Sequence, residues 1–298
     1  MVKNFTAELV DPRKAVLGEG PAWMADSNEL LWIDIIGGHL HFADETGKLL
    51  RSIHVGGDIG VVLPGPDGMF LFANERGLSL LEADGTVKEL NSDIAGLPDI
   101  RFNDGKTDPR GRVLVGTMSY SDAKHAASFY HVDPGAKLRT ITDGITCSNG
   151  LDWSPDRRTF YYIDTLTYRV DAFDYDIETG ELANRRPAFS MPQEWGYPDG
   201  MCLDHDGGLW VAFSGGSSVR RFTPDGEVDV YVEVPVPGVT SCAFGGPNGD
   251  VLFVTTTQFN LSEEELVRYS DSGGLYAVRT GYTGPPATPW TREAVLGD

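Results

Sequence analysis

Short runs of apolar residues, each preceded by a turn signal, recur along the whole chain. Leu30–Asp34 follows the turn residues 25–28, for example, and Leu209–Ala212 follows Asp206-Gly207. Runs of this length, separated by Gly, Pro, Asn and Asp, are typical of strands joined by tight turns. The turns fall near residues 28, 68, 111, 157, 207 and 249. This spacing of roughly 40 to 50 residues is the length of a β-propeller blade, so six turns predict six blades.

Further strands can be recognised inside single repeats. Arg169–Tyr175 alternates between apolar and polar residues before a turn at Glu178–Gly180, which is the pattern of a four-stranded antiparallel blade. The last repeat has no obvious fourth strand. We expect the N-terminal run Phe5–Val10 to complete it and to close the ring. Residues 1–298 are therefore predicted to form a single all-β domain, a six-bladed propeller.

Polar residues occupy one position of this repeat, about eight to ten residues before each turn, which is the length of one strand and its ends. In a propeller the innermost strand of each blade lines the central channel. Residues at the start of these strands should therefore converge on one mouth of the channel. This position holds Glu19, Asp58, Asn103 with Arg101, Asn149, Asp199 and Ser241.

Three of these residues have the chemistry of a metal site. Glu19, Asn149 and Asp199 are oxygen donors, which hard cations such as Ca²⁺, Mg²⁺ or Mn²⁺ prefer, whereas Zn²⁺ more often takes nitrogen or sulfur. Three protein ligands leave positions for water and substrate, as a catalytic metal requires. The alternative is that Asn-Gly and Asp-Gly only make turns. Their recurrence at one position of the repeat favours the site.

The other polar residues leave more than one interpretation open. Arg101, the one cation at this position, is suited either to orient a substrate hydroxyl or carbonyl or to pair with a neighbouring carboxylate. Asp58 is either a channel carboxylate or a turn residue at a strand end. Asp34 and Asp164 end the runs Leu-Trp-Ile-Asp and Tyr-Tyr-Ile-Asp, where capping or turn roles are expected.

Charge and composition exclude several classes of partner. The formal net charge of −20 argues against nucleic acid, which needs a basic surface, and against anionic lipid. No apolar run reaches the length of a membrane span, and the first residues lack the apolar core of a signal peptide. Cys147, Cys202 and Cys242 form no CxxC pattern, which predicts reduced, strand-buried residues of a cytoplasmic protein. We expect a monomer or a weak oligomer.

Several motifs occur in a fixed order that spans nearly the whole chain. They are Leu17–Trp23, Arg101–Lys106, Gly116–Met118, Ser148–Ser154, Phe160–Asp164, Asp171–Asp176, Pro198–Cys202 and Thr240–Gly246. With these motifs the sequence resembles the SMP-30/gluconolactonase/luciferin-regenerating-enzyme family, which includes the regucalcins and bacterial sugar lactonases. The resemblance implies a six-bladed propeller with one divalent metal ion in its channel.

The resemblance also implies roles for individual residues. Glu19, Asn149 and Asp199 match the metal ligands of the family, and Asp199 is in addition the candidate general base. Arg101 and Asn103 match its substrate-contacting positions. One stretch departs from the pattern, because Ser119-Tyr120-Ser121-Asp122 stands where regucalcin-like members carry acidic residues, one of which contacts the sugar. The preferred sugar therefore stays open.

Together these features predict a metal-dependent lactonase that opens a sugar (aldono-) lactone, such as glucono-, xylono- or arabinolactone, to the aldonic acid. The metal is one of Ca²⁺, Zn²⁺, Mg²⁺, Mn²⁺ or Fe²⁺. A Ca²⁺-binding regulatory protein is one alternative, although a rigid propeller has little that could switch and the chain has no EF-hand loop. An esterase or phosphotriesterase on the same scaffold is the other.

Overall fold

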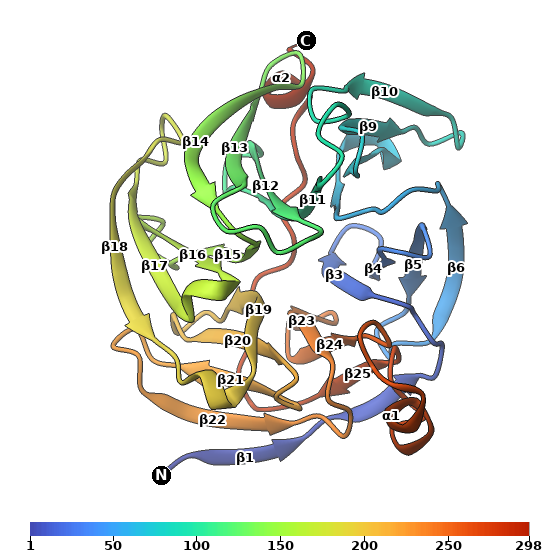
Figure 1. The fold of residues 1–298 in the computed structure, drawn as a ribbon, viewed down its shortest axis with the longest axis vertical. Helices are drawn as coiled ribbons and strands as arrows, with labels where there is room; N and C mark the ends of the chain where they lie inside the picture. Colours follow the sequence, from blue (N-terminus) through green and yellow to red (C-terminus); the bar gives the residue numbers. More distant parts are fainter. Residues whose placement is uncertain (298) are drawn as a thin grey trace.

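Six small sheets stand like blades around a central axis in the computed structural model, which describes residues 1–297 (Figure 1). Blade one contains β3 (Gly18–Met24), β4 (Glu29–Asp34), β5 (His39–Ala43) and β6 (Leu49–His54). Blade two contains β7 (Val61–Pro64), β8 (Phe70–Ala73), β9 (Leu78–Leu81) and β10 (Val87–Asn91). Blade three contains β11 (Ile100–Thr107), β12 (Val113–Ser119), β13 (Ala127–Asp133) and β14 (Lys137–Ile145).

Blades four to six complete the ring. Blade four contains β15 (Ser148–Trp153), β16 (Thr159–Asp164), β17 (Arg169–Tyr175) and β18 (Leu182–Ser190). Blade five contains β19 (Tyr197–Leu203), β20 (Leu209–Ser214), β21 (Ser218–Phe222) and β22 (Val228–Glu233). Blade six contains β23 (Val239–Gly245), β24 (Val251–Thr256) and β25 (Leu275–Val278). The helical segments are short: η1 (Pro66–Gly68), η2 (Thr165–Thr167), η3 (Gln193–Trp195), α1 (Glu263–Arg268) and α2 (Arg292–Val295). The prediction of a six-bladed propeller with four-stranded antiparallel blades is confirmed.

The N-terminal segment closes the ring with two strands rather than one. β2 (Glu8–Asp11) pairs antiparallel with β25 and so supplies the missing strand of blade six. β1 (Lys3–Thr6) instead pairs parallel with β22, which gives blade five a fifth strand. Ala7, between them, is buried and donates its N–H to the carbonyl of Glu233 at 2.8 Å. The N-terminal segment therefore bridges the two blades that meet where the ring closes.

The inner strands β3, β7, β11, β15, β19 and β23 each contact the next around the axis. Glycine makes this close approach possible. A Cβ on Gly150 would lie 2.7 Å from the carbonyl oxygen of Asp199, and one on Gly200 would lie 2.1 Å from the Oγ of Ser241. The Asn149-Gly150 and Asp199-Gly200 dipeptides thus lie inside β15 and β19 and do not form turns. Their glycines serve packing between blades.

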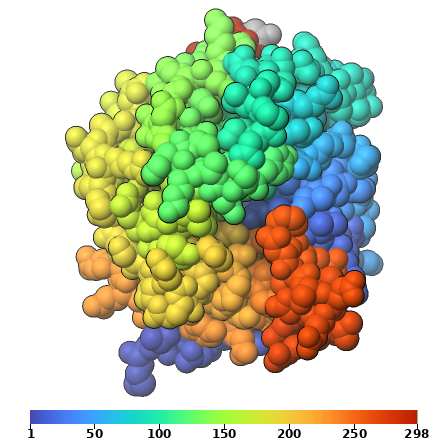
Figure 2. All heavy atoms as spheres, viewed as in Figure 1, coloured from blue at the N-terminus to red at the C-terminus, as the bar shows by residue number. Residues whose placement is uncertain are grey.

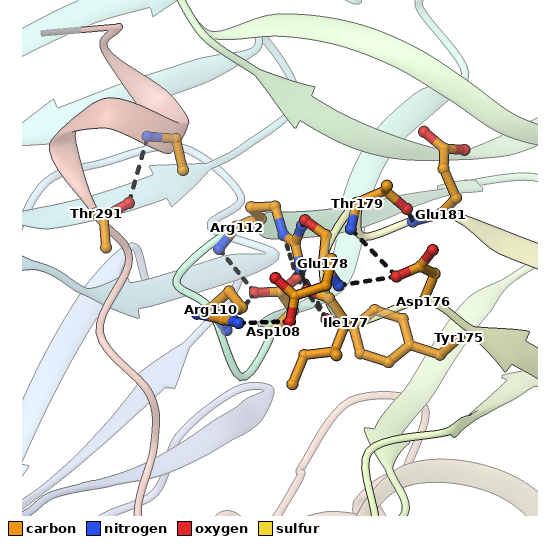
Figure 3. A network of polar contacts seen from close by, with 11 residues as sticks. Asp108, Arg110, Arg112, Tyr175, Asp176, Ile177, Glu178, Thr179, Glu181 and Thr291 are labelled. Atoms are coloured by element: carbon orange, nitrogen blue, oxygen red, sulfur yellow. Dashed lines mark hydrogen bonds and ion pairs between the residues drawn. The ribbon is translucent and has the colours of Figure 1, made fainter.

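Buried aspartates stabilise the turns between the first and the second strand of a blade by accepting hydrogen bonds from the turn. Asp108 is fully buried and accepts hydrogen bonds from the backbone N–H groups of Arg110 and Arg112. Its other oxygen accepts from Arg112 Nε at 2.6 Å and from the hydroxyl of Tyr175, in blade four, at 2.8 Å (Figure 3). Asp204 of blade five holds Arg221 Nε at 2.6 Å in the same way. The turn signals of the sequence therefore also join neighbouring strands and blades.

The inner strands all end at one mouth of the channel, which we name the closed mouth. The C-terminal segment, residues 283–291, crosses this mouth. It is bonded there to five blades by backbone hydrogen bonds of 2.8 to 3.0 Å. The bonded pairs are Thr283 with His205, Gly284 with Gly249, Ala287 with Trp23, Trp290 with Pro64 and Thr291 with Gly111. The other face, at which the inner strands start, is the open mouth. Among residues 1–297 no helix is long and apolar enough to cross a membrane.

Trp290 is the apolar anchor of this segment, and we expect Trp290→Ala to destabilise the protein by about 3–5 kcal/mol because it leaves a large cavity. Its side chain is 1% exposed and packs against Gly65, at which a Cβ would lie 2.2 Å from the indole. Urea unfolding followed by circular dichroism measures the loss. Arg292→Ala, which removes an exposed ion pair with Asp67, is the control and should cost less than about 1 kcal/mol. Equal losses for both variants would contradict the anchoring role.

Candidate active site

The inner strands of four blades bring the predicted site residues to the channel near its open mouth. Glu19 lies on β3, Arg101 and Asn103 on β11, Asn149 on β15 and Asp199 on β19. In each of these strands the pairing register shifts at or beside the residue. Such a β-bulge bends the strand and re-aims its side chains. Four bulges at one position of the repeat are the local reason why polar groups point into the channel here.

Three carboxyl groups from different blades interact in the channel. Burial, followed by the Asp199 and Asp104 carboxyls, raises the pKa of Glu19 well above its usual value. Burial and Asp104 likewise raise the pKa of Asp199, while the side chain of Asn149 acts in the opposite direction. Burial raises the pKa of Asp104 to about 6. Within residues 1–297 none of the three forms an ion pair. A cation bound among them would relieve their repulsion.

The donor set fits a hard cation. Asn149 Nδ2 donates to Thr165 Oγ1 at 2.9 Å, and that hydroxyl in turn donates to the carbonyl of Pro198 at 2.9 Å. Because the amide nitrogen is occupied, the amide oxygen is the atom left for a ligand. In the part of the chain that the structure describes, no three His, Cys, Asp or Glu side chains form a metal-binding group. A site built on Glu19 and Asp199 would take the oxygen of Asn149 as its third ligand.

Arg101 and Asn103 form a connected pair beside these carboxyls. Arg101 Nη1 donates to Asn103 Oδ1 at 2.7 Å and to the carbonyl of Phe102 at 2.9 Å. Asn103 Nδ2 donates to the carbonyl of Ser148 in blade four at 2.8 Å. Arg101 is 6% exposed and forms no ion pair with a described residue, but its charge lowers the pKa of both Glu19 and Asp199. Its guanidinium is held in place but keeps donors available.

Asp34 and Asp164 have the capping roles expected from the sequence. Asp34 accepts from the backbone N–H groups of residues 16 and 17 at 3.0 Å, and Asp164 accepts from that of Cys147 at 3.0 Å. These segments lead directly into the strands that carry Glu19 and Asn149. The two aspartates therefore set the start of two inner strands.

The remaining predicted residues have other surroundings. Asp58 precedes β7 and accepts from the hydroxyl of Tyr120 at 2.6 Å. Ser241 is buried on β23, against Gly200. Cys202 and Cys242 are buried as expected, but Cys147 is only partly buried. Its sulfur lies 3.8 Å from Nδ2 of both Asn103 and Asn149, so it belongs to the site.

A second polar layer, which the sequence interpretation missed, lies deeper in the channel. Lys106 Nζ pairs with Asp152 at 2.8 Å, and Asp152 also accepts the N–H of Leu203 at 2.9 Å. Together with Asp104 these side chains line a cavity of about 340 Å³ that reaches the C-terminal segment. Asp104 and Asp152 each come soon after a site residue, at Asn103-Asp104 and Asn149-Gly150-Leu151-Asp152. This short spacing after a site residue is the sequence feature from which the second layer could have been predicted.

Comparison with known proteins identifies the class that this fold and site define. Residues 17–258 match the protein family described as "SMP-30/Gluconolactonase/LRE-like region". Regucalcin of Danio rerio is 35% identical over 296 residues, which is 97% of this chain and 100% of the fish protein. YvrE of Bacillus subtilis, named as a candidate sugar lactone lactonase, is 34% identical over 289 residues, 96% of this chain and 99% of its own.

The solved structures agree. A calcium-binding protein, regucalcin, from Agrobacterium tumefaciens has a TM-score of 0.91 at 26% identity, with 97% of this chain and 99% of that chain covered. A luciferin-regenerating enzyme has a TM-score of 0.87 at 30% identity over 96% of this chain and 99% of its own. The chain belongs to the SMP-30/gluconolactonase/LRE-like family.

Asp104 should make the stability of the metal-stripped protein depend on pH. Its folded pKa of about 6 lies above the usual 3.8, so the folded state holds a proton that the unfolded state has released. This contribution is complete below about pH 4 and disappears as the pH rises through 6. We expect wild type to lose about 2–3 kcal/mol more than Asp104→Asn between pH 4 and 7, measured by urea unfolding. Identical pH dependence of the two proteins would contradict this.

Proposed function

We propose that the protein is a metal-dependent lactonase that hydrolyses a sugar (aldono-) lactone, such as glucono-, xylono- or arabinolactone, to the aldonic acid. The observation that carries the proposal is the group of partly buried, mutually repelling carboxyls of Glu19, Asp104 and Asp199 next to the Arg101–Asn103 pair. Membership of a family named after gluconolactonase, and a relative named as a candidate sugar lactone lactonase, support it.

Glu19, Asn149 and Asp199 would hold the metal ion. Their oxygen atoms suit a hard divalent cation, and Ca²⁺, Zn²⁺, Mg²⁺, Mn²⁺ and Fe²⁺ are the candidates. When bound, such an ion supplies a Lewis acid that polarises the lactone carbonyl. The carboxyl pKa values, which burial and repulsion raise, mean that protons compete with the ion at low pH.

The side chains have separate tasks in this reaction. The Asp199 carboxylate accepts a proton from the water that attacks the lactone carbonyl, and it returns that proton to the ring oxygen as the acyl C–O bond of the lactone breaks. Arg101, whose guanidinium is oriented by Asn103 and the Phe102 carbonyl, donates to oxygen atoms of the substrate. The product is an anion, which the acidic channel repels, whereas the lactone is neutral.

The substrate would reach this site through the open mouth, because the C-terminal segment crosses the other one. Figure 2 shows that the front face is hollowed near its centre, between the green surface of blade three and the orange surface that follows β24. Large apolar side chains are exposed on the loops of this face, at the start of β19 and in α1. They are Val16, Ile36, Leu97, Tyr120, Tyr197, Phe259 and Val267. Exposed apolar groups beside a polar hollow are typical of a ligand-binding face.

Metal-stripped protein, reloaded with each divalent ion in turn, should hydrolyse at least one lactone of a glucono-, galactono-, xylono- and arabino-lactone panel. We expect the stripped protein to be inactive and one ion to restore rapid acid release, measured by titration. If no lactone is turned over with any ion while one ion still binds tightly, the lactonase proposal fails. The same assay with aryl esters and organophosphates tests the esterase alternative, and Ca²⁺-dependent binding of a partner tests the regulatory one.

Asp199→Ala should lower kcat for that lactone at least about 100-fold, because it removes both a metal ligand and the proton acceptor. Glu19→Gln keeps the proton acceptor and should instead weaken the affinity for the ion, measured by calorimetry. Asp206→Ala, which removes an exposed carboxylate from a turn of the same blade, is the control and should leave kcat unchanged. An Asp199→Ala variant that keeps most of the activity would refute the assignment.

A further inference from the structure

Tyr120 stands at the open mouth on the loop between β12 and β13, and the backbone on both sides of it is fixed. The hydroxyls of Ser119 and Ser121 both donate to Asp99 Oδ2, and the N–H of Ser121 donates to Asp99 Oδ1 at 3.1 Å. The N–H of Tyr120 itself donates to the carbonyl of Asp99 at 2.8 Å. This stretch of the loop therefore presents the tyrosine in a defined position.

The side chain of Tyr120 reaches from blade three to blade two. Its hydroxyl donates to Asp58 Oδ2 at 2.6 Å, and the backbone N–H of Asp58 donates to Glu75 Oε2 at 2.9 Å. Asp58 Oδ1 accepts no hydrogen bond from a described residue. Tyr120 is nevertheless 46% exposed, so the hydroxyl is held by Asp58 while nearly half of the residue's surface stays accessible.

The same ring covers the outer side of the candidate active site. The guanidinium carbon of Arg101 lies 5.7 Å from the ring centre of Tyr120, within the range of a cation–π contact. On its inner side Arg101 donates to Asn103, and its charge acts on Glu19 and Asp199. Tyr120 and Asp58 thus form the next layer outward from Arg101, on the path by which a substrate would enter.

We propose that Tyr120 and Asp58 form a specificity-determining wall that recognises the hydroxylated part of the substrate. The free ring packs against the C–H face of a polyol, and Asp58 Oδ1 accepts a hydrogen bond from one of its hydroxyls. An aromatic face next to a fixed polar group is what orients a small polar ligand in a pocket. This inference rests on the proposed lactonase function of the same site, and it identifies the hydroxylated part of the substrate as the part that the wall binds.

A purely structural latch between the two blades would use the same hydrogen bond, but it makes a different prediction. A latch needs only the tyrosine hydroxyl and the Asp58 carboxylate, and its loss would loosen the loop for every substrate alike. Recognition needs the ring face as well, and loss of the ring weakens the binding only of ligands that carry hydroxyls. Substrates with and without hydroxyls therefore separate the two roles.

The test compares Tyr120→Phe, Tyr120→Ala and Asp58→Asn on two kinds of lactone. For the aldonolactone that wild type hydrolyses best, we expect KM to rise about tenfold in Tyr120→Ala and several-fold in Asp58→Asn. Tyr120→Phe keeps the ring and should stay within about threefold of wild type. For an unsubstituted lactone of the same ring size, kcat/KM should stay within about twofold in all three variants. Lys124→Gln removes an exposed charge from the same loop, outside the stretch 119–122, and is the control.

Calorimetric binding of a five- or six-carbon alditol, which has the hydroxyls but no ester, gives a readout independent of turnover. We expect Tyr120→Ala to weaken it about tenfold. Equal losses on both lactones, or unchanged KM and alditol affinity, would overturn the wall while leaving the lactonase proposal intact. Alditol binding that depends on Tyr120 without hydrolysis of any lactone would support the wall and overturn the lactonase. Wild-type protein that neither binds alditols nor hydrolyses lactones would overturn both.

Discussion

The close packing of the six inner strands around the axis is the constraint on which the rest of the structure depends. Gly150 and Gly200 sit where a Cβ would collide with the neighbouring inner strand. The residues before them, Asn149 and Asp199, are consequently brought to the axis together with Glu19 from a blade that is remote in sequence. The same glycines that look like turn formers in the sequence therefore allow the polar residues of different blades to meet.

This packing creates an electrostatic cost that the protein does not relieve with its own ion pairs. Glu19, Asp104 and Asp199 are partly buried in the channel, and each has a raised pKa. Deeper in the channel the situation differs, because Lys106 neutralises Asp152. Among the described residues Lys106 pairs with Asp152 and also lowers the pKa of Asp104, whereas Glu19 and Asp199 form no ion pair. The channel thus has a deeper structural layer and an outer layer suited to a cation.

The two mouths of the channel are also built differently. The C-terminal segment bonds to five blades across the closed mouth, and its own Trp290 is buried. The open mouth carries loops with exposed aromatic side chains, among them Tyr120. A base held by backbone hydrogen bonds and a mouth of loops let such a fold keep one site while the loops vary what enters it.

The sequence by itself determined the number of blades, the four-stranded pattern and the position of Glu19, Arg101, Asn103, Asn149 and Asp199 in the repeat, because turn chemistry and strand alternation are local properties of the chain. Only the tertiary structure decided which groups touch across blades. The Tyr120–Asp58 contact joins residues 62 apart in sequence, and the parallel pairing of β1 with β22 joins the N-terminal residues to the fifth blade. The segment around residues 283–291 has no strand pattern, so its course over the closed mouth follows from contacts that exist only once the ring has closed.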